Sequence, residues 1–448
     1  MDYKFSVIIP LYNVSAYLTE TVDSVLAQSI GFEENIQLIL VNDGSTDDTE
    51  QICLSIRDAY PDNVTYVYQE NAGVSAARNA GIPFIAGKYT NFMDGDDRWD
   101  IDAFRSVWDM FESNGENINV IACRMDYFEA DTGYHKLDYK FKDGDMICDI
   151  FEHPTYGQFS VCSAFCRSED IRDLTFDTRL SYGEDAKFIN QLILKARQYG
   201  LLAGSVYHIR KRNTEISLTQ TKLSKPTAYI DTARYYYEYL ADLSADLYGR
   251  IIPYVQYALI NALKYRVTSA IPDTIPQQIS EPYIELLNNL ISRLDDDVIC
   301  SAPKMLTETK IYLFTQKYGA VSLKSLISLR NGYVYVNNHR AGRLFSKDSL
   351  IIKTIHQSFL GIKISGTIRC PEIIDSFSIR VCCGNSKYIA SISRTPSKTR
   401  FSFADTPISS IYDFSVRIPA SKCTDPKVLE WTIIANGNEI AAAPEYKV

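Results

Sequence analysis

The sequence lacks any run of about 18 apolar residues, the length that a helix needs to cross a bilayer. Cysteine pairs at zinc-binding spacing are also missing, because the ten cysteines are scattered, and Cys162 and Cys166 have three residues between them (CxxxC) rather than two. The N-terminal residues show no secretory leader pattern and run straight into a strand-like segment. We therefore expect reduced thiols and a cytoplasmic protein, with peripheral contact at the inner face of the membrane as an open alternative.

Several nucleotide-binding and hydrolytic motifs are absent. There is no Gly-Lys-Ser/Thr phosphate loop, and no GxGxxG follows the first predicted strand. These absences disfavour a P-loop NTPase and a dinucleotide-dependent dehydrogenase. There is also no GxSxG or HExxH, the motifs of serine hydrolases and zinc proteases.

The chain has no excess of positive charge. It contains 46 Lys and Arg against 55 Asp and Glu, for a net charge of −9. This balance lacks the cationic footprint of nucleic-acid-binding proteins, so we expect no nucleic-acid partner. The 46% hydrophobic and 23% charged residues are typical of globular proteins, and 448 residues suggest about three domains.

Three segments differ in pattern, and we take them as domains at 1–220, 221–329 and 330–448. The first alternates apolar runs with helical periodicity, which predicts βαβ units and an α/β sheet. Its expected strands are 5–10, 36–41, 64–68 and 89–93, and its expected helices are 15–28, 46–59, 73–86 and 186–196. The second segment has helical periodicity around three prolines, with a helix expected over 282–294. The third predicts a β-sandwich, with strands at 333–337, 362–369, 376–382, 388–394, 412–418 and 430–434.

Carboxylates gather where the strands of the first segment end. Ligands bind at this edge in doubly wound sheets. The run Asp94-Gly95-Asp96-Asp97 follows the fourth predicted strand. Three carboxylates in four residues repel one another unless a cation is present, and oxygen ligands suit Mg²⁺ or Mn²⁺. The alternative is a solvated acidic turn that caps the next helix.

Other candidates each have a structural alternative. Asp43 ends the second strand, where it can bind a base or ribose or simply begin a turn. Arg78 lies on a helix after the small-residue run 71–77, where it can hold a phosphate or form a structural salt bridge. Glu184 and Asp185 open a helix, so they either cap it or supply a general base. The basic stretch 207–212 around His208 is a phosphate contact or an exposed loop.

The order of these motifs carries more information than any one of them. SVIIPLYN, VNDGSTDDT, ENAGVSAARNAGI, FMDGDD and GED follow one another along the chain. This series resembles the inverting family 2 glycosyltransferases over roughly residues 3–220. The resemblance implies the glycosyltransferase-A fold, a Rossmann-like mixed sheet. The helical segment and C-terminal β domain more loosely resemble wall teichoic acid glycosyltransferases, which carry an immunoglobulin-like module behind the catalytic domain.

The resemblance implies a role for each matching residue. Asp185 is the general base, supported by Glu184, and Asp96 is a metal ligand together with Asp94. Tyr12 stacks on the nucleotide base, and His208, with Arg210 and Ser217, matches a mobile loop that closes on the diphosphate. The implied nucleotide-sugar contacts are Pro10, Tyr12, Asp43, Asn71, Arg78, Asp94, His208, Arg210 and Ser217.

The implied reaction moves a sugar from a nucleotide-sugar to a hydroxyl group, with inversion and with Mn²⁺ or Mg²⁺ as cofactor. UDP-GlcNAc, UDP-GalNAc, UDP-Glc and UDP-Gal are the expected donors. The expected acceptor is a cell-surface polymer, such as teichoic acid or capsular polysaccharide, or its lipid-linked precursor. A non-catalytic sugar-nucleotide or glycan-binding protein and a nucleotidyltransferase are the alternatives.

The third segment has no carboxylate or histidine cluster that suggests catalysis. By analogy with its architectural relatives we expect a homo-oligomerisation module, with glycan binding and a spacer role as alternatives. Basic residues gather where the segment begins: Arg330, His339, Arg340, Arg343 and Lys347. They suggest a contact for the acceptor or for a membrane.

Overall fold

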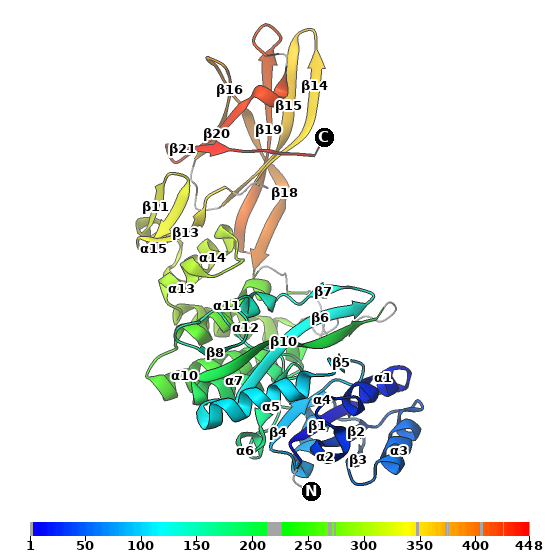
Figure 1. Ribbon diagram of the computed structural model, residues 1–448. Coiled ribbons are helices and arrows are strands. Elements are labelled where there is room, and N and C mark those ends of the chain that lie inside the picture. The colour runs from blue at the N-terminus through cyan, green and yellow to red at the C-terminus, as the bar shows by residue number, and fades with distance from the viewer. Residues whose placement is uncertain are drawn as a thin grey trace. The chain divides into compact units, whose positions relative to one another are not determined.

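The computed structural model divides into two compact units, Met1–Val255 and Gln256–Val448 (Figure 1). The structure describes residues 3–212, 226–267, 271–272, 275–345, 349–371, 374, 376–403, 406–423 and 425–447. The unit division falls inside helix α11 (Pro253–Arg266), so it does not follow the predicted boundary at residue 220. In the described part of the chain, the helices are too short or too polar to span a membrane.

The first unit is built on one mixed sheet with the strand order β3-β2-β1-β4-β9-β6-β10-β5. The first four strands of this order are parallel, and β9 and β5 run antiparallel to their neighbours. The short strands β7 (Gly133–Tyr134) and β8 (Met146–Asp149) pair with β6 and β10. The main strands are β1 (Phe5–Leu11), β2 (Ile36–Asp43), β3 (Val64–Gln69), β4 (Tyr89–Phe92), β5 (Arg98–Trp99), β6 (Val120–Glu129), β9 (Ala164–Arg167) and β10 (Gln198–Lys211).

Burial explains why the apolar runs form the centre of this sheet. All eight residues of β2 are buried, as are six of the seven in β1. Strands covered on both faces read as continuous apolar runs rather than as alternating ones. The unit's longer helices are α1 (Ser15–Leu26), α3 (Thr49–Ala59), α4 (Val74–Gly81), α5 (Ala103–Asn114), α7 (Glu184–Ala196) and α10 (Tyr239–Tyr248). The predicted α/β class is confirmed.

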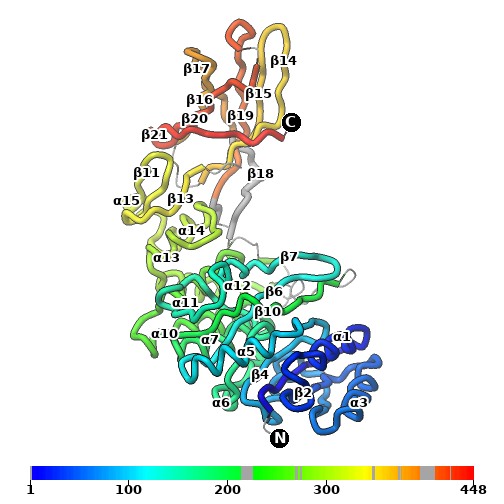
Figure 2. The backbone as a smooth tube through the Cα atoms, viewed as in Figure 1, coloured from blue at the N-terminus to red at the C-terminus, as the bar shows by residue number. Residues whose placement is uncertain are grey.

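The second unit begins with helices and ends with sheets (Figure 2). Its helices include α12 (Gln277–Ser292), α13 (Asp296–Ser301), α14 (Thr307–Tyr318) and α15 (Ala320–Leu326). A three-stranded sheet follows, formed by β11 (Ile327–Arg330), β12 (Tyr333–Val336) and β13 (His339–Arg343). Two further sheets have the orders β18-β19-β15-β14-β22 and β17-β16-β20-β21. Their strands are β14 (Leu350–Ser358), β15 (Gly361–Pro371), β16 (Phe377–Cys383), β17 (Ser386–Ile389), β18 (Ser391–Phe403), β19 (Thr406–Pro419), β20 (Glu430–Ala435), β21 (Asn438–Ala442) and β22 (Glu445–Tyr446).

The start of one predicted helix is wrong. We expected the helix to begin at Pro282, but α12 begins at Gln277 and contains Pro282. Proline removes one backbone hydrogen bond inside a helix. Here Tyr283, Leu287 and Leu290 are buried along the same helix, and this packing outweighs the lost bond because tertiary contacts supply most helix stability.

Candidate functional site

The acidic turn lies between β4 and β5, at the carboxyl end of the parallel strands. Gly95 is tightly enclosed there, since an added Cβ would lie 2.7 Å from Leu11 Cδ2 on β1. Tyr207 on β10 accepts a hydrogen bond from the Asp94 amide at 3.1 Å. The turn is therefore held between two strands of the sheet, and its side chains lie at the sheet edge where ligands bind in this class of fold.

Arg78 joins the acidic turn to the start of α7. Its side chain is 3% exposed, and the guanidinium donates to Asp185 Oδ1 at 2.6 Å and to Asp94 Oδ1 at 3.0 Å. Burial raises the pKa of Asp94; Arg78 opposes this rise, and Asp185 and Asp96 add to it. The structural salt bridge that we considered for Arg78 is present, and its contact with a nucleotide stays a prediction.

Asp185 has one oxygen anchored and one open. Gly183 precedes α7 with φ of 87°, so the helix begins abruptly and both acids fall in its first turn. Glu184 is buried, whereas the Asp185 side chain is 21% exposed. Oδ1 accepts from Arg78, and among the described residues nothing donates to Oδ2. An oriented carboxylate with an open oxygen is the arrangement that a general base requires.

Asp96 and Asp97 face two arginines from the end of β10. Arg212 donates to Asp96 Oδ2 through two nitrogens, at 3.0 and 2.7 Å. The Arg210 amide donates to Asp97 Oδ1 at 2.8 Å, and Arg210 Nε donates to the Asp96 carbonyl at 2.8 Å. Burial and the neighbouring carboxylates raise the pKa of Asp97 well above its usual range. Arg212 therefore offsets part of the negative charge of the turn, whereas the Arg210 guanidinium forms its ion pairs with Glu20 and Glu129.

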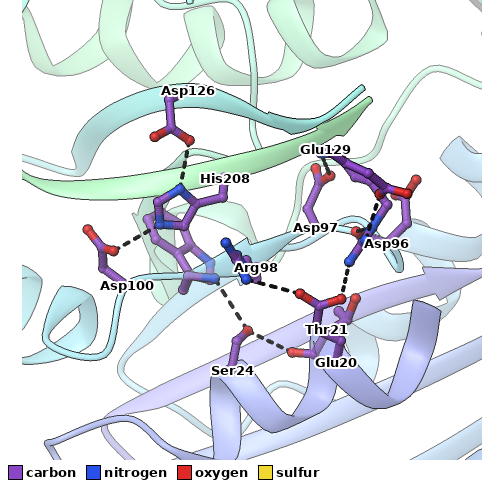
Figure 3. A network of polar contacts seen from close by, with 12 residues as sticks. Glu20, Thr21, Ser24, Asp96, Asp97, Arg98, Asp100, Asp126, Glu129 and His208 are labelled. Atoms are coloured by element: carbon purple, nitrogen blue, oxygen red, sulfur yellow. Dashed lines mark hydrogen bonds and ion pairs between the residues drawn. The ribbon is translucent and has the colours of Figure 1, made fainter. Parts of the chain in front are cut away.

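His208 lies between two carboxylates, as Figure 3 shows. Its Nδ1 is 2.7 Å from Asp126 Oδ1 and its Nε2 is 2.9 Å from Asp100 Oδ1. Both ring nitrogens can donate together only when the ring is an imidazolium. The predicted loop position is wrong for His208 and Arg210, because both lie on strand β10 and are fixed by these contacts. Their role toward the diphosphate stays a prediction, and Ser217 lies outside the described residues.

The predicted base-binding residues cluster at the ends of β1 and β2. Tyr12 is 51% exposed directly after β1, and Pro10 lies on that strand. Asp43 is buried, and its oxygens accept from Gln69 and from the amides of Ala72 and Gly73 at 2.7 to 2.9 Å. Asn71 donates to the Asp43 carbonyl at 3.1 Å. Asp43 thus shapes the turn before α4, and its contact with a base stays a prediction.

Sequence reasoning missed several partners in this site. Cys162 Sγ lies 3.1 Å from Asp94 Oδ2 and 3.6 Å from Arg78. Asp100 and Asp126 hold His208 from 108 and 82 residues away. No motif marks these residues, because each is defined by a contact between segments that are far apart in the sequence. Arg212 was visible in the basic stretch, but nothing in the sequence paired it with Asp96.

The acidic turn has the oxygen ligands that a divalent cation prefers. Its side chains offer only carboxylate oxygens, which suit Mg²⁺ or Mn²⁺. Asp96 Oδ1 has no partner among the described residues, while Oδ2 is held by Arg212. The described residues contain no group of three or more His, Cys, Asp or Glu placed to hold a metal ion. A cation here would therefore need ligands from water or a bound phosphate in addition to Asp96.

Comparison with known proteins agrees with this geometry. Residues 6–174 match the model of glycosyl transferase family 2. The minor teichoic acid biosynthesis protein GgaB of Bacillus subtilis is 30% identical over 96% of this chain and 48% of its own length. The protein GgaA of the same organism is 36% identical over 58% of this chain and 59% of its own length. The chain thus spans about half the length of these curated relatives.

Solved structures share the fold at low sequence identity. The S. aureus TarS fragment 1–349 in complex with UDP-GlcNAc matches with a TM-score of 0.55 and 18% identity, covering 74% of this chain and 96% of the fragment. Longer TarS matches with a TM-score of 0.56 and 15% identity over 99% of this chain and 78% of its own. Residues 6–174 thus match glycosyl transferase family 2, and the sheet of the first unit has the glycosyltransferase-A fold.

Proposed function

We propose that this protein is an inverting glycosyltransferase that moves a sugar from a nucleotide-sugar to a hydroxyl group of a cell-surface polymer. The observation that carries the proposal is Asp185, whose Oδ1 is anchored by Arg78 while Oδ2 stays open. This carboxylate lies beside the acidic turn, because the same guanidinium also binds Asp94. A base and a diphosphate-binding edge therefore share one site.

The chain's own residues supply the steps of the reaction. Asp185 Oδ2 accepts the proton of the acceptor hydroxyl as the oxygen attacks the anomeric carbon, opposite the nucleotide. Attack from that face converts an α-linked donor into a β-linked product. Tyr12 offers an exposed ring for stacking on the base. A divalent ion held by Asp96, with Asp94 as the second ligand, would neutralise charge on the departing diphosphate.

The relatives support the choice of substrates. Teichoic acid biosynthesis appears in the names of GgaB and GgaA, and TarS binds UDP-GlcNAc. We accordingly propose a UDP-sugar donor, with GlcNAc, GalNAc, Glc or Gal as the sugar, and a teichoic acid or related polymer as acceptor. The proposed place of action is the cytoplasm, with peripheral membrane contact and homo-oligomerisation as further proposals.

The test combines transfer and binding. We expect Asp185→Asn to lower transfer by ~10²- to 10⁴-fold, the usual effect of losing a general base, because the amide can still accept from Arg78 but cannot take a proton. UDP binding, followed by thermal shift with Mn²⁺, should stay within about twofold of the unmodified protein. The matched control is Asp23→Asn on the exposed side of α1, which should change neither quantity.

The products distinguish the alternatives. A glycosyltransferase releases a nucleoside diphosphate, whereas a nucleotidyltransferase releases pyrophosphate. A binding protein on this scaffold would release neither while still showing a thermal shift with the nucleotide. An Asp185→Asn variant that loses binding and turnover equally would contradict the role of Asp185 as the base.

A further inference from the structure

The three-stranded sheet of the second unit has two unlike faces. On one face Val334, Val336 and Ala341 are buried, and β13 packs against α13 and α14. The other face carries Tyr333 and Tyr335 on the central strand, since side chains alternate along a strand. Strand pairing places Arg330 and Arg343 opposite Tyr333, and Arg340 opposite Tyr335. We call the set Arg330, Tyr333, Tyr335, Arg340 and Arg343 the Arg–Tyr face.

Contacts within the Arg–Tyr face hold its cations in place. Arg343 Nε donates to the Tyr333 hydroxyl at 3.2 Å, and the Arg340 guanidinium carbon lies 4.8 Å from the centre of the Tyr333 ring. Arg330 lies 5.3 Å from the centre of the Tyr335 ring and donates to Asn338. Arg343 lowers the pKa of Tyr333. The guanidinium groups are therefore arranged over aromatic rings rather than extended freely into solvent.

No carboxylate balances this charge among the described residues. Arg330, Arg340 and Arg343 are exposed, and none of them forms an ion pair there. The sequence explains the imbalance, because no Asp or Glu occurs between Glu308 and Asp348, while seven Lys and Arg do. This stretch contrasts with a chain whose net charge is −9. Three arginines on one sheet face with no ion pair in the described part of the chain favour an anionic ligand.

We propose that the Arg–Tyr face binds the phosphodiester backbone of a polymer, and that this polymer is the acceptor. The second part rests on the proposed function. Guanidinium groups match phosphate oxygens in a two-pronged geometry, and tyrosine rings offer flat, amphipathic surfaces to sugar or polyol units. Adjacent strands are about 4.8 Å apart, so arginines on the outer two strands lie about 10 Å apart across the central one. This spacing suits successive phosphates of a chain better than one phosphate.

The binding test uses a fluorescent glycerol phosphate oligomer of about ten units and measures anisotropy with the full chain. We expect the combined variant Arg330→Gln, Arg340→Gln, Arg343→Gln to bind the oligomer at least about tenfold more weakly. Each lost charge-assisted hydrogen bond removes part of the binding free energy. Its dependence on salt should also become less steep, as fewer phosphates are neutralised. The matched control removes three exposed cations elsewhere in the second unit, through Lys363→Gln and Arg417→Gln on another sheet and Lys422→Gln in the turn that follows β19. It should bind like the unmodified protein.

Three results would overturn the proposal. Equal weakening in both variants would show a general effect of net charge, and unchanged binding in the first would show that the face is not used. Loss of binding to vesicles of phosphatidylglycerol and phosphatidylcholine, with oligomer binding intact, would identify a membrane contact instead. Thermal unfolding of each variant checks that the sheet remains folded.

Turnover separates this proposal from the proposed function. The variant of the Arg–Tyr face should keep kcat with an acceptor of one repeat unit and raise KM for the long polymer. If the unmodified protein transfers sugar to no acceptor, the proposed function fails, while the anisotropy result still decides what the Arg–Tyr face binds.

Discussion

Arg78 is the residue on which the geometry of the site depends. It is buried and pairs with carboxylates on two different segments. We expect Arg78→Gln to destabilise the first unit by about 1–3 kcal/mol, less than for a fully buried ion pair, because the Asp94 and Asp185 side chains are 40% and 21% exposed and water can reach them. Arg78→Lys should lower the free energy of unfolding by less than Arg78→Gln does, while remaining less stable than the unmodified protein. One ammonium group cannot bridge both carboxylates as the planar guanidinium does. Urea unfolding curves measure both effects.

The control for Arg78 is an exposed pair of the same types. Arg57 donates to the neighbouring Asp58 at 2.7 Å, with both side chains largely exposed. Arg57→Gln should change the free energy of unfolding by less than about 1 kcal/mol, because surface pairs contribute little. A similar loss in both variants would contradict the bridging role of Arg78.

Lys140 gives the first unit a pH dependence. It is fully buried, its ammonium group donates to the Gln158 side chain and to the Gly157 carbonyl, and burial lowers its pKa to about 7. The unfolded chain keeps this proton up to about pH 10.4. Between these values the unfolded state binds more protons, so the stability of the folded state rises with pH. Between pH 7.5 and 9 this gain is about 2 kcal/mol relative to Lys140→Met.

Comparison with Lys140→Met removes the contribution of every other titrating group. Urea unfolding of both proteins at pH 7.5 and 9 measures the difference in free energy of unfolding. A difference that stays constant with pH would mean that Lys140 keeps its proton in the folded state.

At the scale of elements, the start of α7 depends on one glycine. Gly183 has φ of 87°, and an added Cβ would lie 2.4 Å from the Tyr236 ring. Gly183→Ala therefore adds a clash to backbone strain, for a loss of stability of about 2–4 kcal/mol. Because Asp185 lies in the first turn of α7, we also expect transfer to fall by about 10²-fold, as small displacements of a base are costly.

A second glycine separates the effect of the clash with Tyr236 from the effect of backbone strain. Gly249 ends α10 with φ of 72° and has open space around it. Gly249→Ala should lose only the strain of about 1–2 kcal/mol and keep full transfer activity. Equal effects of the two substitutions on thermal unfolding and turnover would exclude the contact with Tyr236 as a cause.

Two of the predicted strands have a simple pattern of burial. Strands β1 and β2 are apolar throughout because both of their faces are covered. Strands β13 and β14 were not predicted, because each leaves polar or charged residues exposed along much of its length. The residues of the site also divide into those that the sequence predicts and those that it does not. Parallel strand ends brought the acidic turn and Asp43 to one edge as expected, whereas contacts such as that of Asp126 with His208 join segments 82 residues apart.

At the scale of the whole molecule, the second unit contains its own buried ion pair. Arg369 on β15 donates to Glu308 on α14 at 2.9 Å, with both side chains almost fully buried. We expect Arg369→Met to leave Glu308 without this charge and to destabilise the second unit by about 3–5 kcal/mol. Because the chain forms two compact units, calorimetry should show one transition lowered and the other unchanged.

Nucleotide binding identifies which transition belongs to which unit. Saturating UDP with Mn²⁺, at 100 times its dissociation constant, should stabilise the first unit by about 2.7 kcal/mol. The same stabilisation should appear in Arg369→Met, and the double variant Arg369→Met, Glu308→Leu should recover part of the lost stability. Loss of UDP stabilisation in Arg369→Met would show that the units are coupled.

The acidic turn is tied to β10 on both of its sides. At the start of the turn the Asp94 amide donates to the Tyr207 hydroxyl at 3.1 Å, and at its end Asp97 Oδ1 accepts from the Arg210 amide at 2.8 Å. The backbone between these two bonds has little freedom to change its path when a substrate arrives. Adjustment to different ligands must then come from rotation of side chains such as Asp96 and Arg212. The backbone of the site therefore keeps one path, and only the side chains change rotamer. Sugars of different size would then be accommodated by different rotamers at the same edge of the sheet.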